Sequence, residues 1–273
     1  ILDEPTAVLT PQETDELLGV MKELAASGTS IVFITHKLRE VLAVSDRVYV
    51  LRQGAVVGEV ATKDTDARGL ATMMVGREVV LSIDKADASP TDTVLTITDL
   101  HVKDDRDLGA VNGFTLSVRA GEIVGVAGVE GNGQSELLEC LSGLRAGRAG
   151  SASLGGIDLS RSGPPAWFKA GRAVSPEGRQ KRGLVGEFSV AENLVLGRHR
   201  EAKFVKRGFV KAAARDEEAA GLVKRFDVRP ADVAVEAQTL SGGNQQKAIV
   251  ARELSRQPKL LLAAHPTRGV DIG

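Results

Sequence analysis

Apolar side chains fall at helical spacing near the start of the chain. Residues 17–24 place leucine and methionine on one face of a helix, and Thr10, Pro11 and Glu13 precede them. Threonine followed three residues later by glutamate, with proline at the first helical position, is the sequence of a capping box. The pattern therefore predicts a helix that begins at Pro11 and is stopped by Gly28.

A nearly continuous apolar run at residues 30–35 predicts a strand buried in a parallel sheet. His36 comes directly after this run, just as Asp3 and Glu4 come after the apolar residues that open the chain. In open α/β sheets, ligands bind at the carboxyl ends of the strands. The two carboxylates and the imidazole are therefore candidate site residues.

Other elements are predicted on both sides of a polar stretch, residues 82–92, whose Asp, Ala, Ser and Pro content is typical of a linker. Before it, residues 47–51 and 55–60 predict a hairpin that turns at Gln53–Gly54. A short helix is predicted at residues 66–75. After the linker, the predicted strands are residues 94–100, 114–118 and 259–263, and the predicted helices are residues 167–173, 191–196, 211–226 and a segment ending at Ser255.

Residues 121–144 predict an apolar strand, a glycine loop and an amphipathic helix in succession. Gly128, Gly133, Gln134 and Ser135 reproduce the spacing of a P-loop, whose glycines let backbone N–H groups turn onto a phosphate at a helix N-terminus. The pattern calls for lysine where Gln134 stands. At about 4 Å and an effective dielectric of about 20, the missing charge is worth roughly 4 kcal/mol before desolvation. The loop is therefore expected to bind a nucleotide less tightly and to catalyse poorly.

Composition narrows the classes of protein. A chain of 273 residues with 42% hydrophobic content is enough for one large or two small domains. No apolar run approaches the roughly 20 residues that span a bilayer, so a soluble or peripheral protein is expected. A net charge of −1 argues against a dominant electrostatic surface for nucleic acid. The single Cys140 excludes an intrachain disulfide and predicts a buried packing role. Because Ile1 lies within a predicted strand, we expect a segment of a longer protein.

The end of the chain repeats its start. Ala264 and His265 follow an apolar strand and align with Asp3 and Glu4, so the chain is expected to cover about one period of a tandem repeat. The sequence LSGGNQQK, residues 240–247, precedes the second copy. Taken singly, an acid pair is commonly a solvated cap, a lone histidine structural, and Ser-Gly-Gly a turn. The order of the motifs favours a functional site.

With these motifs in this order, the chain resembles the ATP-binding subunits of ABC transporters over essentially its whole length. It is most similar to tandem importers of simple sugars and nucleosides, and closest to nucleoside importers that work with basic-membrane-lipoprotein binding subunits. The resemblance implies an α/β P-loop NTPase fold with a mostly parallel core sheet, an antiparallel β subdomain and a helical signature subdomain. It implies that residues 1–81 end a first nucleotide-binding domain, that residues 82–92 form a linker, and that residues 93–273 form a second domain truncated after its D-loop.

The resemblance also implies roles for single residues. Asp3 and Glu4 would end the Walker B strand of the first domain, and His36 would be its H-loop. Asp3 would orient Mg²⁺ through water, Glu4 would polarise the attacking water, and His36 would contact the γ-phosphate. In the second domain the implied residues are Gly128, Gly131, Asn132, Gly133, Gln134 and Ser135 (Walker A, with Ser135 a weak Mg²⁺ ligand), Glu177 (Q-loop), Ser241, Gly242, Gly243 and Gln245 (signature), and Ala264 and His265 (degenerate Walker B).

Departures from the family pattern fall on the second domain. It has Gln134 in place of lysine, Ala264 and His265 in place of the two acids, Glu177 in place of glutamine, and no aromatic residue near 100–103 to stack on adenine. ABC domains pair head to tail, so the resemblance implies that the first domain's acids and His36 share one competent ATP site with the signature. The other site would be silent.

The resemblance implies ATP and Mg²⁺ as cofactors, and transmembrane permease subunits and a periplasmic or lipoprotein solute-binding protein as partners. No nucleic acid partner is expected, and the location would be the cytoplasmic face of the membrane. A soluble tandem ABC ATPase acting on ribosomes or DNA is the alternative, and a regulatory ATP-binding module is a third possibility. The sequence leaves open the transported solute, and whether the first unit docks onto the second or forms a separate lobe.

Overall fold

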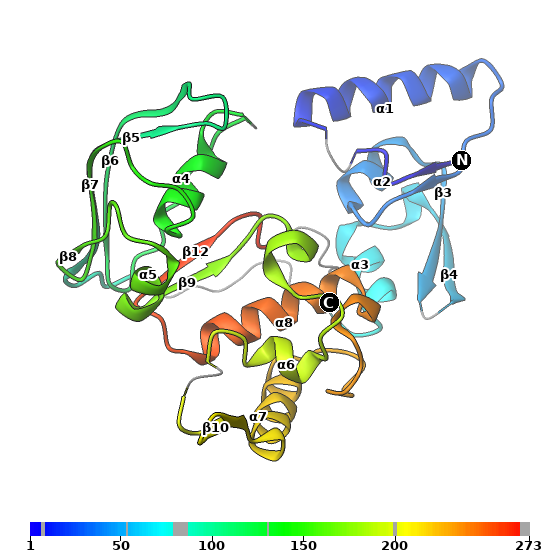
Figure 1. The fold of residues 1–273 in the computed structure, drawn as a ribbon. Helices are drawn as coiled ribbons and strands as arrows, with labels where there is room; N and C mark the ends of the chain where they lie inside the picture. Colours follow the sequence, from blue (N-terminus) through cyan, green and yellow to red (C-terminus); the bar gives the residue numbers. More distant parts are fainter. Residues whose placement is uncertain (7–8, 53, 79–86, 130, 199–200, 268–273) are drawn as a thin grey trace. The chain divides into compact units, whose positions relative to one another are not determined.

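A computed structural model of the chain describes residues 1–6, 9–52, 54–78, 87–129, 131–198 and 201–267. They form two compact units, one within residues 1–85 and the other within residues 86–270. Figure 1 shows their helices and strands. None of the helices in the described part of the chain is long and apolar enough to cross a membrane.

The first unit combines a parallel strand pair, a hairpin and helices. Its elements are β1 (Leu2–Asp3), α1 (Pro11–Ala26), β2 (Phe33–Ile34), α2 (Leu38–Val44), β3 (Arg47–Arg52), β4 (Ala55–Ala61), η1 (Thr62–Asp64) and α3 (Ala67–Val75). The capping box of α1 is confirmed, because the Thr10 hydroxyl accepts from the Glu13 amide and the Glu13 carboxylate accepts from the Thr10 amide. The hairpin and α3 are confirmed as well, although Gln53 of the predicted turn lies outside the described residues. The core consists of Leu38, Val41, Val50, Leu70 and Ala71.

The predicted buried strand at residues 30–35 is wrong in its length and its burial. Only Phe33 and Ile34 are in strand geometry, paired in parallel with Leu2 and Asp3. Val32 is 57% exposed and Ile34 49% exposed. A strand becomes buried when neighbours flank it on both sides and helices cover its faces. In the described part of the chain β2 has one neighbour, β1, so its apolar residues stay open to solvent.

The second unit contains an antiparallel sheet, a parallel strand pair and a group of helices. Its elements are β5 (Thr93–Lys103), β6 (Gly109–Arg119), α4 (Gln134–Leu141), β7 (Ala149–Leu154), β8 (Ile157–Asp158), α5 (Pro164–Ala170), β9 (Arg172–Ser175), η2 (Arg179–Gly183), α6 (Val190–Leu194), β10 (Val205–Lys206), β11 (Phe209–Val210), α7 (Ala212–Arg225), η3 (Ala237–Thr239), α8 (Gly242–Ser255) and β12 (Leu260–Ala263). The antiparallel sheet has the order β6-β5-β7-β8, and β12 pairs with β9 in parallel. The predicted strands in β5, β6 and β12 and the helices α6, α7 and α8 are confirmed.

Two predictions for the second unit are wrong. The apolar residues before the glycine loop, 122–128, are not in a strand, and Ile123 is 80% exposed. A strand exists only where a neighbour pairs with its backbone, and no described strand is paired with this segment. The helix predicted at residues 167–173 ends earlier, because Gly171 adopts a left-handed φ of 103°. Residues 172–175 then form β9, which the sequence patterns did not predict.

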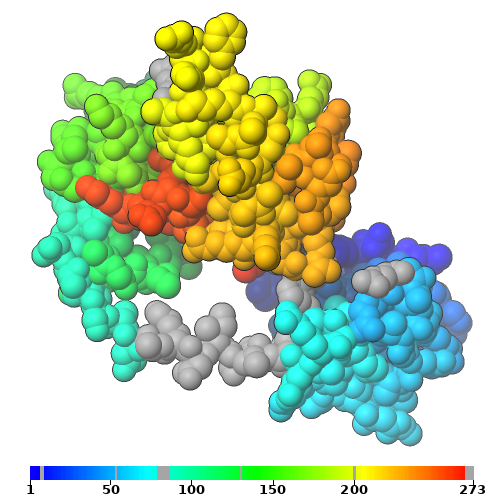
Figure 2. All heavy atoms as spheres, turned by 90° about the horizontal axis from the view of Figure 1, so that it is seen from below, coloured from blue at the N-terminus to red at the C-terminus, as the bar shows by residue number. Residues whose placement is uncertain are grey.

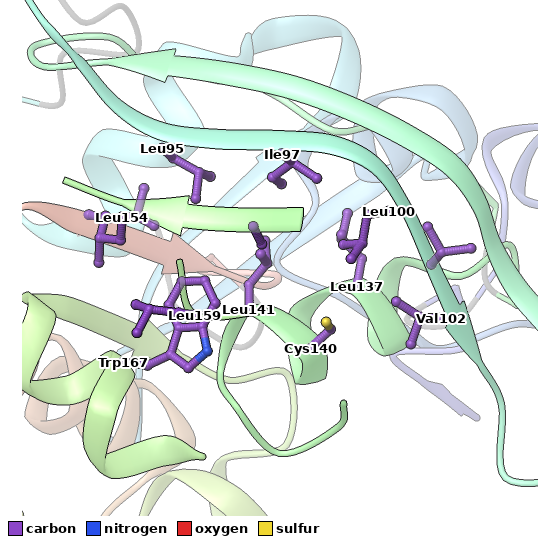
Figure 3. Close-up of a cluster of buried hydrophobic side chains, with 13 residues drawn as sticks. Leu95, Ile97, Leu100, Val102, Leu137, Cys140, Leu141, Leu154, Leu159 and Trp167 are labelled. Atoms are coloured by element: carbon purple, nitrogen blue, oxygen red, sulfur yellow. The ribbon is translucent and has the colours of Figure 1, made fainter. Parts of the chain in front are cut away.

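The two largest apolar clusters in the described part of the second unit pack its sheet and its helices. The larger one packs the antiparallel sheet against α4 and α5, and Figure 3 shows the side chains of β5 facing those of α4 and Trp167. Cys140 belongs to this cluster and is 2% exposed, which confirms its predicted packing role. Burial raises the pKa of its thiol. The smaller cluster joins α6, α7 and α8.

The strand β12 is the last element of this unit, and its Leu260 belongs to the larger cluster. It follows α8 along the chain and pairs with β9. On the face seen in Figure 2 its red atoms reach the surface beside green and orange atoms of the same unit. Leu261 of this strand is accordingly 42% exposed, whereas Leu260 is buried.

Leu100→Ala should destabilise the second unit by about 2–5 kcal/mol, because it leaves a cavity in the larger cluster. The side chain is 0% exposed there. The single tryptophan, Trp167, lies in the same cluster, so its fluorescence during urea unfolding reports on this unit. Leu108→Ala is the matched control, since Leu108 is 57% exposed and should leave the urea midpoint unchanged. Equal midpoints for the two variants would contradict the assignment of this core.

Candidate functional site

The ends of β1 and β2 bring a carboxylate and an imidazole together. The two strands are parallel, and the Glu4 amide donates to the Ile34 carbonyl at 2.8 Å. The residues that follow the two strands therefore lie at the same edge of the pair. Glu4 Oε1 then lies 2.7 Å from His36 Nδ1. The side chains are 50% and 31% exposed, respectively, and remain accessible to a ligand. The structure thus places two of the predicted site residues in direct contact.

The oxygen donors next to this pair suit Mg²⁺. Asp3 and Glu4 are consecutive and exposed, and carboxylates are ligands that Mg²⁺ prefers. Within the described ranges no group of three or more His, Cys, Asp or Glu residues is gathered to hold an ion. In ATPase sites Mg²⁺ is usually bound through one or two carboxylates, and substrate phosphates and water supply its other ligands.

The glycine loop ends at a helix N-terminus, as predicted. Gly133 is the N-cap of α4 and has a left-handed φ of 96°. A Cβ atom on it would lie 2.4 Å from the Ala110 carbonyl oxygen, so only glycine fits there. Gly131 also has a positive φ, 89°, and it is exposed together with Asn132 and Ser135. The loop therefore presents the first turn of α4 to solvent, which is the geometry that binds phosphate groups.

Gln134 folds back onto the loop that carries it. Its Nε2 donates to the Val129 carbonyl at 3.0 Å. The same nitrogen lies only 2.1 Å from the position that a Cβ on Gly128 would take, so the amide packs directly over that glycine. Gln134 therefore stabilises the loop internally and adds no positive charge to it.

A second group of polar side chains lies at the end of β9 and β12. The Ser135 hydroxyl donates to Glu177 Oε2 at 3.5 Å, and His265 Nε2 is 3.9 Å from Glu177 Oε1. The ladder of β9 and β12 continues to Ala264, whose amide donates to the Ser175 carbonyl at 2.9 Å. The structure therefore brings the predicted Walker A serine, the Q-loop position and the degenerate Walker B positions together.

The residues at the ends of β1 and β12, which align in the repeat, have the same backbone conformation but different side chains. Glu4 has a φ of 43° and His265, its counterpart in the repeat, a φ of 45°. Left-handed φ values are uncommon for residues other than glycine. Their recurrence at aligned positions supports the repeat that the sequence predicted. A carboxylate occupies this position in the first unit and an imidazole in the second.

The signature segment begins α8. Ser241 is the N-cap of this helix, and its hydroxyl accepts from Asn244 Nδ2 at 2.9 Å. It is exposed, and Gly242 and Gly243 are partly exposed in the first turn. Gln245 differs from them, because it is 4% exposed and its Nε2 donates to the Leu240 carbonyl at 3.2 Å. Its side chain therefore supports the loop before the signature from inside the unit.

Sequence patterns did not single out Arg179. Its Nη1 donates to the Gly242 carbonyl at 2.8 Å, and a Cβ on Gly242 would lie 3.1 Å from its Nη2. Arg179 opens the π-helical turn η2, two residues after Glu177, so it connects the Q-loop segment to the signature. The only signal in the sequence was a basic run, residues 179–182, and such a run is ordinarily a solvated surface.

Comparisons with known proteins agree with this geometry. A family model described as ABC transporter matches residues 111–268. A nucleoside import ATP-binding protein of Lactococcus lactis subsp. cremoris is 46% identical over 273 residues, which cover 100% of this chain and 54% of that protein. A glucose import ATP-binding protein of Haloferax volcanii is 46% identical over 275 residues, covering 100% of this chain and 50% of that protein. A guanosine import ATP-binding protein of Bacillus subtilis is 45% identical over 273 residues, which cover 100% of this chain and 54% of that protein. The chain spans about half the length of these curated relatives.

Solved structures show the same fold. An ATP-binding cassette of an ABC transporter matches with a TM-score of 0.54 at 23% identity, over 66% of this chain and 72% of that one. A dimeric ATP-binding cassette bound to ADP and Pi in a post-hydrolysis state matches with a TM-score of 0.54 at 21% identity, over 65% and 76% of the two chains. Together with the glycine loop, the signature segment and the paired strand ends, these likenesses establish that the chain belongs to the ABC transporter ATP-binding family.

Proposed function

We propose that this chain is part of an ATPase subunit that powers the import of nucleosides or simple sugars. The observation that carries the proposal is the contact of Glu4 with His36 at the ends of parallel strands, next to Asp3. Residues 1–81 would end a first nucleotide-binding domain, and residues 93–273 would form most of a second. The relatives reported above are named for the import of nucleosides, glucose and guanosine, which favours an importer over an ATPase acting on ribosomes or DNA.

In the competent site, the Glu4 carboxylate would accept a hydrogen bond from the attacking water and so polarise it, and Asp3 would orient Mg²⁺ through a water molecule. His36 would hold the Glu4 carboxylate through its Nδ1 and contact the γ-phosphate through its other nitrogen. Mg²⁺, when bound with ATP, neutralises charge on the phosphates. In the assembled protein, Ser241 and the N–H groups of the signature glycines would close over the same phosphate. Such positioning and charge stabilisation account for most of the catalysis of phosphoryl transfer.

The second site would bind ATP without hydrolysing it. Its loop carries Gln134, whose amide is bonded to the loop's own Val129 carbonyl. Its strand end carries Ala264 and His265, neither of which is a carboxylate. Ser135 and Glu177 would still offer oxygen ligands to Mg²⁺ there, although weakly.

The proposed partners are transmembrane permease subunits and a periplasmic or lipoprotein solute-binding protein, with the ATPase on the cytoplasmic face of the membrane. The solute is chosen in the pockets of those partners. Nucleosides and simple sugars therefore both remain within the proposal, as the names of the relatives suggest.

Glu4→Gln in the complete subunit should lower ATP turnover by about 10²-fold or more, because it removes the base-like carboxylate and keeps its shape. ATP binding should persist. His265→Ala is the matched control at the aligned position of the repeat and should leave most of the turnover. Phosphate release from the two variants and the unchanged protein measures this. Similar losses from both substitutions would refute the asymmetry of the two sites.

Gln134→Lys in the 273-residue chain should tighten ATP binding by up to about 4 kcal/mol, since it supplies the missing charge. Calorimetric titration with ATP measures the change. Gln134→Ala serves as the companion variant, because it removes the bond to Val129 without adding charge. Unchanged affinity in Gln134→Lys would mean that the backbone N–H groups, and not side-chain charge, set the affinity of the loop.

A further inference from the structure

The carboxylate of Glu40 is buried close to the segments that carry Glu4 and His36, and it is not part of the Glu4–His36 pair. Glu40 is in the first turn of α2 and is 5% exposed. Buried carboxylates are rare unless they are paired or hydrogen-bonded. The sequence patterns assigned it no role, and the proposed reaction does not use it.

Glu40 binds both segments that carry the catalytic pair. Its Oε2 accepts from the Thr6 hydroxyl at 2.8 Å and from the Thr35 hydroxyl at 3.4 Å. Thr6 comes two residues after Glu4, and Thr35 comes one residue before His36. One carboxylate oxygen therefore connects the segment after β1 to the segment after β2.

Lys37 completes the network from the other side. Its Nζ is 3.2 Å from Glu40 Oε1 and donates to the Thr6 carbonyl at 2.9 Å and to the Thr6 hydroxyl at 3.1 Å. Its backbone amide donates to the Thr35 hydroxyl at 3.1 Å. Thr6 is 1% exposed and the Glu40 side chain 6% exposed, so the bond between them is shielded from competing water, whereas the Lys37 side chain is 39% exposed.

The hydrogen-bond network of Glu40, Lys37 and Thr6 lies directly after the last backbone bond between β1 and β2. The Glu4 amide makes the last backbone bond of the ladder, to Ile34, and Glu4 itself has the left-handed φ of 43°. A glutamate holds such a conformation only where its surroundings fix it. The bonds from Glu40 and Lys37 to Thr6 supply that constraint two residues further along the chain.

We propose that Glu40, together with Lys37, is a positioning residue that clamps the segments after β1 and β2 and so fixes the Glu4–His36 pair for ATP hydrolysis. The proposal rests on the function proposed above, in which that pair acts on the water that attacks ATP. Misplacement of a reacting group by about 1 Å can cost roughly 10²-fold in rate, which is the scale of effect expected here.

The first test measures hydrogen exchange of the Glu4 amide in the 273-residue chain. Thr6→Val removes the hydroxyl and keeps the side-chain volume, and Glu40→Ala removes the carboxylate. Both should speed exchange at Glu4 by about tenfold or more, while the amides of β3 and β4 keep their protection. Thr6→Ser should restore the slow rate. Glu59→Gln is the control, because Glu59 is a half-exposed carboxylate bonded to Tyr49 in the same unit.

The second test measures turnover and ATP binding in the complete subunit. Thr6→Val and Glu40→Ala should lower kcat roughly 10- to 100-fold, with the Kd for ATP changed by less than about twofold. Thr6→Ser should recover most of the kcat. Unchanged exchange at Glu4 would overturn the clamp. Faster exchange with an unchanged kcat, or faster exchange throughout β3 and β4, would overturn its positioning role.

Glu4→Gln, assayed alongside, separates this proposal from the function on which it rests. If Glu4→Gln keeps full turnover, the proposed function fails, and the exchange rates alone decide whether the clamp exists. If Glu4→Gln loses turnover and the clamp variants do not, the function stands and the positioning role fails.

Discussion

Parallel pairing of short strands is the constraint on which the candidate sites depend. Parallel strands end at the same edge, so side chains that follow them meet even when they are far apart in the sequence. The pair of β1 and β2 thereby joins Glu4 to His36, and the pair of β9 and β12 brings Glu177 to His265. Each site is thus assembled by a few backbone bonds and not by a local motif.

The two strand ends use the same backbone for different chemistry. The left-handed conformation recurs at Glu4 and His265, but the first strand end carries two acids, Asp3 and Glu4, where the second carries Ala264 and His265. In the second unit the Gln134 side chain donates to the Val129 carbonyl of the same loop, and the Ser135 hydroxyl donates to the Glu177 carboxylate. These differences support the proposal that the first strand end serves hydrolysis, whereas the second site lacks the loop lysine and the two strand-end acids.

Local signals in the sequence predicted their elements correctly, whereas two apolar runs did not form the strands that they predict. The capping box at Thr10, the hairpin and the helix after Gly133 were predicted correctly, because short-range sterics and hydrogen bonds specify them. The run at 30–35 predicts a buried strand and the run before the glycine loop an apolar strand. Among the described residues the first has one strand neighbour and the second has none, so burial and pairing fail there. Sequence patterns did not identify Arg179 or Glu40, because their hydrogen-bond partners, Gly242 and Thr6, are distant in sequence.

The asymmetry of the two sites is the central claim of this account. It is tested most directly by loading the complete subunit with ATP at both sites and measuring, in a single turnover without excess nucleotide, how much of the bound ATP becomes ADP. The account predicts that one ATP per subunit is hydrolysed and that the other remains intact. Hydrolysis of both at comparable rates would contradict it.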